Sequence, residues 1–243
     1  MWNIKVQIND DFNSDLEPLI NEVAGEYLRI IPSGPLSVYR PITVSYNKNF
    51  PIVFDRPNIA NYAIGLSIDG NYWNQTVFQF AHEMCHLYCG SRVTNGFIES
   101  ICCMASFYFL DLIGNKWQTS FTRGQRNYAH YFLSYKNNEI SKHLPQTSML
   151  DDYIREIDIC NVHPVNDRDK QTIIACKLLS VFENNLDSWA VIPYLGAACE
   201  PTPVEPTDYI EDSKFNFTTL HAIVPDHLKP IVKEIADILN INI

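Results

Sequence analysis

The chain has 243 residues, a formal net charge of −10, seven cysteines and seven histidines. This length is enough for an extensive hydrophobic core, built as one large domain or two small lobes. The acidic balance and the lack of any Lys/Arg run argue against a nucleic-acid partner. We expect no membrane span, and no signal peptide in the opening residues MWNIKVQINDDF, which lack a basic segment followed by an apolar one.

The cysteines indicate thiol rather than disulfide chemistry. Their number is odd, their spacing is irregular, and Cys102 and Cys103 are adjacent, which prevents an easy bridge between them. This pattern favours reduced thiols and a cytoplasmic location.

The first 114 residues predict a small sheet with helices. A strand is expected at 3–8, and a helix at 11–30 that is capped by Asn13 or Ser14 and stops before Pro32. Short strands are expected at 36–39, 42–46 and 52–54, and another at 61–69. Two helices follow, from Asn74 to Gly90 and over 97–113.

The remaining residues predict mostly helix, at 125–135, 147–156, 167–185 and 226–239, with an extended connector at 201–206. The predicted fold class is therefore α+β. It has a lobe at 1–114 with a small mixed sheet and helices, and a mostly helical lobe at 115–243 packed against it in a single compact unit.

The most specific motif is His82-Glu83-Met84-Cys85-His86, which reads H-E-x-x-H. At about 100° per residue, His82 and His86 lie about 40° apart around a helix and one turn apart along it. Both imidazoles then lean toward one point, as two zinc ligands must. Glu83 falls at the edge of the same face, where a carboxylate can take a proton from zinc-bound water.

The rest of the motif helix supports this interpretation. One side is an apolar stripe that predicts a core-facing wall, formed by Val77, Phe80, Ala81, Met84, Leu87 and Tyr88. The other side predicts the floor of a cleft and carries Gln75, Phe78, Gln79, His82, Glu83 and His86. The simpler alternative is a pair of histidines on a solvated face.

A catalytic zinc needs a third protein ligand, and Glu99 is the candidate. It is the only charge in the first fourteen residues of the apolar helix expected at 97–113. A buried carboxylate needs a cation or strong donors, and zinc would supply the cation. Alternatively, Glu99 serves the helix dipole from the first turn.

With these residues, the chain resembles the gluzincin branch of the zincin metallopeptidases. The resemblance covers roughly residues 40–113 and implies His82, His86 and Glu99 as ligands of one zinc per chain, with Glu83 as the general base. It also implies a strand along the cleft that pairs with substrate, and the strand at 61–69 is the candidate. A Tyr or His from the C-terminal part would stabilise the oxyanion, and the candidates are His130, Tyr131, His163, Tyr194 and His221.

The chain departs from the family pattern in two ways. The gap from His86 to Glu99 is short, and Cys103 stands where a carboxylate usually braces a zinc histidine. Cys89, about 20° from His82 around the helix, is a rival ligand.

The function expected from the sequence is zinc-dependent hydrolysis of peptide bonds in a peptide or protein substrate. The alternatives are a regulatory or binding protein on a zincin scaffold with little or no turnover, and a structural zinc domain closed by His82, His86, Glu99 and a cysteine. The oligomeric state and the substrate specificity do not follow from the sequence.

Overall fold

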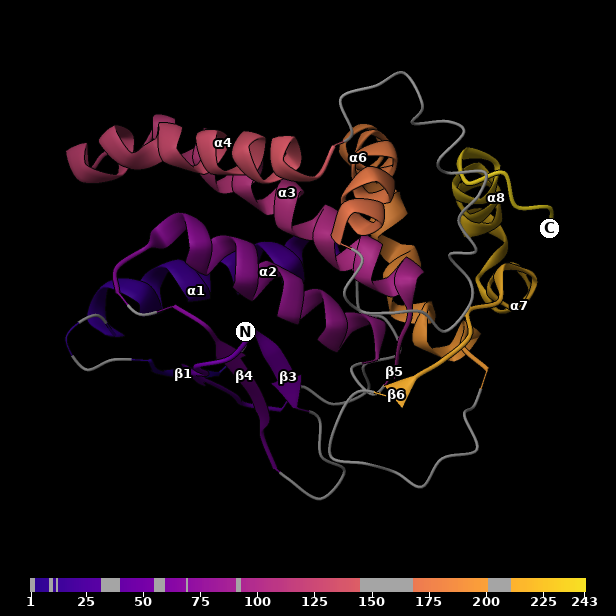
Figure 1. The fold of residues 1–243 in the computed structure, drawn as a ribbon, viewed down its shortest axis with the longest axis horizontal. Helices are drawn as coiled ribbons and strands as arrows, with labels where there is room; N and C mark the ends of the chain where they lie inside the picture. The colour runs from indigo at the N-terminus through magenta and orange to yellow at the C-terminus, as the bar shows by residue number, and fades with distance from the viewer. Residues whose placement is uncertain are drawn as a thin grey trace.

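A computed structural model of the chain describes residues 3–8, 11, 13–31, 40–54, 60–68, 70–90, 93–144, 168–200 and 211–243. The helices lie on one side of a small sheet, which is an α+β arrangement (Figure 1). The expected strand at 36–39, the helix at 147–156 and the connector at 201–206 lie outside the described residues.

The main sheet has four strands in the order β1-β2-β4-β3. The strands are β1 (Ile4–Gln7), β2 (Ile42–Tyr46), β3 (Ile52–Phe54) and β4 (Tyr62–Leu66). β2 pairs in parallel with both β1 and β4, and β3 runs antiparallel to β4 at the edge. The sheet is therefore mixed, and β4 is paired along both of its sides.

Two helices cover the sheet, α1 (Asn13–Ile30) and α2 (Trp73–Cys89), as Figure 1 shows. They are joined by a buried hydrogen bond of 2.6 Å from the hydroxyl of Tyr27 to the carbonyl of Ala81. α2 confirms the expected motif helix and its start near Asn74, since it begins at Trp73, but its N-cap is Tyr72, which makes no side-chain hydrogen bond. It ends at Gly90, whose φ of 93° is readily adopted only by glycine.

The central helix is α3 (Gly96–Gln118), which packs against α2, α4 (Arg123–His143) and α6 (Arg168–Asn184). It extends five residues beyond the expected end at 113, so the expected lobe boundary at 114 falls inside it. By length and composition α3 is apolar enough to cross a membrane, contrary to our expectation that no segment is. In this fold, 83% of its most apolar window is buried among the surrounding helices.

The C-terminal part is helical and joins the same hydrophobic core. It contains the 3₁₀ segments η1 (Leu186–Tyr194), η2 (Gly196–Ala198) and η3 (Asp226–Leu228), and the helices α7 (Phe217–Ile223) and α8 (Lys229–Ile238). A short parallel pair, β5 (Val93–Thr94) with β6 (Glu211–Asp212), ties this part to the start of α3.

Candidate metal centre

His82 and His86 lie on the side of α2 that faces the start of α3, and Glu83 faces β3. The opposite, apolar side is buried as expected, with Val77, Phe80 and Met84 fully enclosed. The polar side is also largely covered, since His86 and Glu83 are only 3% and 4% exposed. His82 is partly exposed, so the motif lies at the boundary between the core and a cavity.

Glu99 occupies the first turn of α3, next to these histidines. The side chain of Asn95 caps this helix by accepting a hydrogen bond of 2.9 Å from the backbone N–H of Ile98. The hydroxyl of Thr94, in β5, donates to Oε1 of Glu99 at 2.6 Å. Glu99 is only 7% exposed, and its carboxylate is held by contacts with Thr94 and His82.

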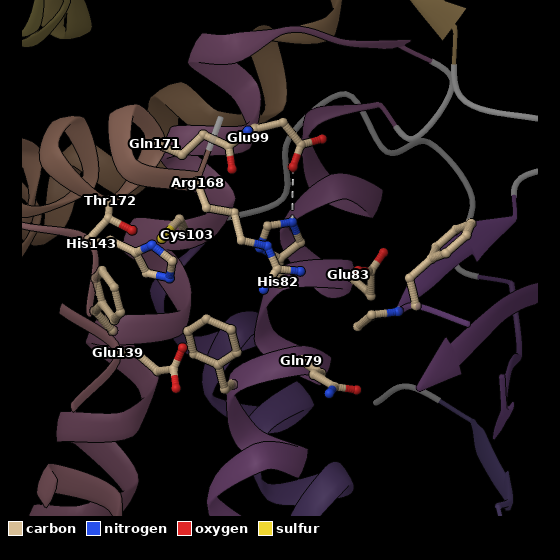
Figure 2. Close-up of a pocket in the computed structure, with 14 residues that line it drawn as sticks. Gln79, His82, Glu83, Glu99, Cys103, Glu139, His143, Arg168, Gln171 and Thr172 are labelled. Carbon is tan, nitrogen blue, oxygen red and sulfur yellow. Dashed lines mark hydrogen bonds and ion pairs between the residues drawn. The ribbon is translucent and has the colours of Figure 1, made fainter. Parts of the chain in front are cut away.

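The three predicted ligands converge on one point. Nε2 of His82 lies 3.2 Å from Nε2 of His86 and 3.2 Å from Oε2 of Glu99. Nε2 of His86 lies 3.4 Å from Oε1 of Glu99. Figure 2 shows the Glu99 carboxylate directed at the His82 ring. One nitrogen from each imidazole and the carboxylate thus form a compact triangle of donors.

Without a cation, protons must hold this triangle together. A ring nitrogen offers either one N–H or one lone pair, so two facing Nε2 atoms repel unless a proton lies between them. Burial by itself lowers the pKa of His86, but the Glu99 carboxylate outweighs it and raises that pKa to about 9. Burial likewise opposes the charge on Glu99, whereas His86 and His82 hold its pKa well below the ordinary value.

Glu83 is positioned differently from the other two motif residues. Burial raises the pKa of its carboxyl, which the charge of Glu99 reinforces and the imidazoles of His82 and His86 oppose. The backbone N–H of Val53, in β3, donates to this carboxylate. Glu83 therefore lies between the donor triangle and the edge strand of the sheet.

A cavity of about 340 Å³ opens over His82, Glu83 and Glu99. It lies between the region of β3 and the helices α2, α3, α4 and α6 (Figure 2). Its walls are partly apolar and are completed by Phe50, Pro51, Phe78, Gln79, Cys103, Phe107, Glu139, His143, Arg168, Gln171 and Thr172. Of the six residues expected on the cleft-facing side, Phe78, Gln79, His82 and Glu83 line the cavity, whereas Gln75 and His86 do not.

The prediction that the strand at 61–69 runs along the cleft is wrong in one respect. β4 (Tyr62–Leu66) pairs with β2 on one side and β3 on the other, so its backbone has no side left for a substrate. The edge strand is β3, and its Val53 N–H points to Glu83. In an antiparallel ladder both polar groups of a residue point the same way, so the Val53 carbonyl also faces away from β4.

None of the described oxyanion candidates lines the cavity. His130 and Tyr131 lie on the exposed side of α4, and Tyr194 and His221 lie elsewhere in the C-terminal part. His163 lies outside the described residues.

The structure instead brings His143 and Arg168 to the cavity, from the end of α4 and the start of α6. Nδ1 of His143 lies 2.8 Å from Oδ1 of Asp169. In Figure 2 the Arg168 side chain extends toward His82, and His143 lies on the other side of His82 from Glu83. No spacing in the sequence links His143 to Asp169, so sequence reasoning missed them.

The cysteines also differ from expectation. The sulfur of Cys102, not of Cys89, lies within 4.8 Å of the ring nitrogens of His82 and His86. Cys103, which replaces the expected bracing carboxylate, lines the cavity. Nδ1 of His86 has no hydrogen-bond partner among the residues that the structure describes. Among the described residues, no group therefore braces the His86 ring through Nδ1.

Comparisons of the chain with protein-family models, with curated proteins and with solved structures return no match. The function proposed below is accordingly carried by the arrangement of His82, His86, Glu99 and Glu83.

Proposed function

We propose that this protein is a zinc-dependent peptidase of the gluzincin type. The observation that carries the proposal is the donor triangle of His82, His86 and Glu99. The two Nε2 atoms are 3.2 Å apart, Oε2 of the carboxylate lies 3.2 Å from Nε2 of His82, and its Oε1 lies 3.4 Å from Nε2 of His86. With metal–ligand bonds of about 2.1 Å, the donors of a tetrahedral zinc stand about 3.4 Å apart. Two imidazole nitrogens and one carboxylate oxygen are also a ligand set that leaves the fourth position open.

When bound there, zinc supplies Lewis-acid polarisation of a carbonyl and lowers the pKa of a water molecule. The protein's own base is Glu83, whose carboxylate takes a proton from the attacking water and delivers it to the leaving amine. Its burial supports this role, because a raised pKa brings the carboxyl closer to the pH at which it both accepts and donates. The Val53 N–H fixes the carboxylate's orientation.

The edge strand β3 and the cavity support a peptide substrate. An extended peptide can add to the outer edge of a strand through backbone hydrogen bonds, and the Val53 carbonyl, which faces away from β4, is an acceptor on that edge. The aromatic walls at Phe50, Phe78 and Phe107 suit an apolar side chain next to the scissile bond.

His143 is the residue best situated to stabilise a developing oxyanion. Asp169 accepts a hydrogen bond from Nδ1–H of His143, which fixes the tautomer and directs Nε2 away from Asp169. Nε2 also carries an N–H when the ring is the imidazolium, and in that form it can bind a carbonyl oxygen as negative charge develops on it. Arg168 adds a second positive group to the same cavity.

Glu83→Gln is the central test. We expect this variant to retain about one zinc per chain and to lose about 10²–10⁴-fold in peptidase activity, the usual contribution of a general base. Glu17→Gln, on the exposed side of α1, is the matched control and should behave as the wild type. Zinc is measured by mass spectrometry, and cleavage with a broad peptide library. A wild-type protein that holds one zinc and cleaves no peptide in the library refutes the proposal and favours a binding or regulatory role.

A second function is favoured by one observation, the proximity of Cys102 to His82 and His86. If Cys102 were the fourth ligand, the site would be closed and zinc would only stabilise the fold. That function predicts zinc loss in Cys102→Ala, whereas the peptidase predicts full zinc retention in the same variant. Glu99→Ala should weaken zinc retention sharply in either case.

A further inference from the structure

Three cysteine thiols meet at the interface of α2 and α3, next to the donor triangle. Cys85 and Cys89 are one turn apart on α2, and Cys102 approaches them from α3. Their sulfur atoms all lie within 4.8 Å of one another. Each thiol is in hydrogen-bonding contact with the other two. At most 1% of each residue is exposed.

Packing alone is the simplest explanation for a buried cysteine, because its side chain is small and apolar. It accounts well for Cys103, Cys176 and Cys199, which belong to no such group within the described chain. It does not account for three sulfurs directed at one point from two helices. A thiol is a weak donor and a weak acceptor, so mutual contacts among three of them contribute little to stability by themselves.

We propose that Cys85, Cys89 and Cys102 form a binding site for one thiophilic cation, specifically copper(I). A metal–sulfur bond of about 2.3 Å places the sulfurs of a trigonal plane about 4.0 Å apart, which agrees with the observed grouping. Soft sulfur ligands select copper(I) and zinc among the common cations. A structural zinc requires four ligands, whereas copper(I) is satisfied by three, and the described residues group three sulfurs here.

This site is distinct from the donor triangle, although Cys102 lies near both. The triangle offers nitrogen and oxygen ligands beside an open cavity, whereas the three thiols offer only sulfur ligands and are buried in the core. Binding displaces thiol protons to solvent and transfers no electron, so copper stays in the +1 state. Since the thiols are enclosed, copper enters during folding or local opening of the helices.

The test measures copper(I) binding to the full chain with its donor triangle saturated by excess zinc. Copper(I) is supplied without oxygen from a competing chelator, with a phosphine as reductant. We expect about one copper(I) per chain and a near-ultraviolet sulfur-to-copper charge-transfer band. X-ray absorption on the wild type should show three sulfurs at about 2.3 Å and no nitrogen. This last measurement does not depend on any variant folding.

Variants assign the ligands. Cys102→Ala and Cys89→Ala should lose the copper and its band while keeping the far-ultraviolet circular dichroism of the wild type. Cys103→Ala, the neighbour of Cys102 that lines the cavity, is the matched control and should keep both. A band that survives Cys102→Ala, or a wild type that binds no copper(I), overturns the proposal. If His82→Ala also abolishes the charge-transfer band, the three-cysteine proposal is overturned in favour of a mixed His/Cys site.

Discussion

The pairing of His86 with Glu99 gives a sharp prediction for the metal-free protein. The carboxylate is the reason that the pKa of His86 reaches about 9, against an ordinary value of about 6.5, because burial acts in the opposite direction. In Glu99→Gln the charge is removed with little change of shape. We therefore expect the pKa of His86 to fall to 6.5 or below.

The energetic consequence follows from the size of that change. A fall from about 9 to about 6.5 corresponds to about 3 kcal/mol at about 1.4 kcal/mol for each pH unit. A raised pKa in the folded state stabilises the protein fully below the unfolded value, and this contribution disappears as the pH rises through the folded value. The stability difference between wild type and Glu99→Gln should thus shrink by about 3 kcal/mol between about pH 6.5 and pH 9.

Two assays check this. Proton NMR of chelator-treated protein follows the His86 ring across the pH range, and urea unfolding at pH 6.5 and at about pH 9.5 gives the stability difference. Thr94→Val is the control, because it removes the hydroxyl that donates to Glu99 but leaves the charge, so the His86 pKa should stay high. A His86 pKa that remains near 9 in Glu99→Gln, or a stability difference that does not vary with pH, would refute the reasoning.

Two further predictions follow from the same structure. Zinc binding must displace the proton of His86, so the apparent zinc affinity should rise about tenfold per pH unit between about pH 7 and 9. A competition titration in which the zinc affinity does not change with pH contradicts this. At Gly196, an added Cβ would lie 2.2 Å from the carbonyl oxygen of Cys89, at the end of α2. Gly196→Ala should therefore cost about 3 kcal/mol or more of stability in urea unfolding. At Gly25, an added Cβ would meet no atom within 4 Å, so Gly25→Ala should instead stabilise α1 by about 0.5–1 kcal/mol. Equal changes of unfolding free energy in the two variants would contradict the steric argument.

Local patterns in the sequence predicted the helices with useful accuracy. The 3.6-residue period from Val77 to Tyr88 located α2, and Gly90 marked its end, because a positive φ is cheap only for glycine. The boundaries were less accurate. α3 continues to Gln118 because its last turns still pack against α1 and α4, and this burial is not visible in the local pattern.

The position of the cleft strand was not predictable in the same way. β3 and β4 both have strand character, and which of them forms the edge depends on the order of strands in the sheet. That order is set by long-range pairing, here a parallel pair of β2 with β4 and an antiparallel return of β3. The same limit applies to His143, Asp169 and Arg168, which meet only because α4 and α6 lie side by side.

By itself, the sequence determined the relation among His82, Glu83 and His86, because a single helical turn fixes how neighbouring side chains are arranged. It also singled out Glu99 as a carboxylate in an apolar helix. Only the tertiary structure decided that Glu99 meets both histidines, that β3 faces Glu83 and that Cys102 joins Cys85 and Cys89. Each of these contacts joins separate elements, and the packing of α2 against α3 and the sheet is set by the hydrophobic core as a whole rather than by any local segment.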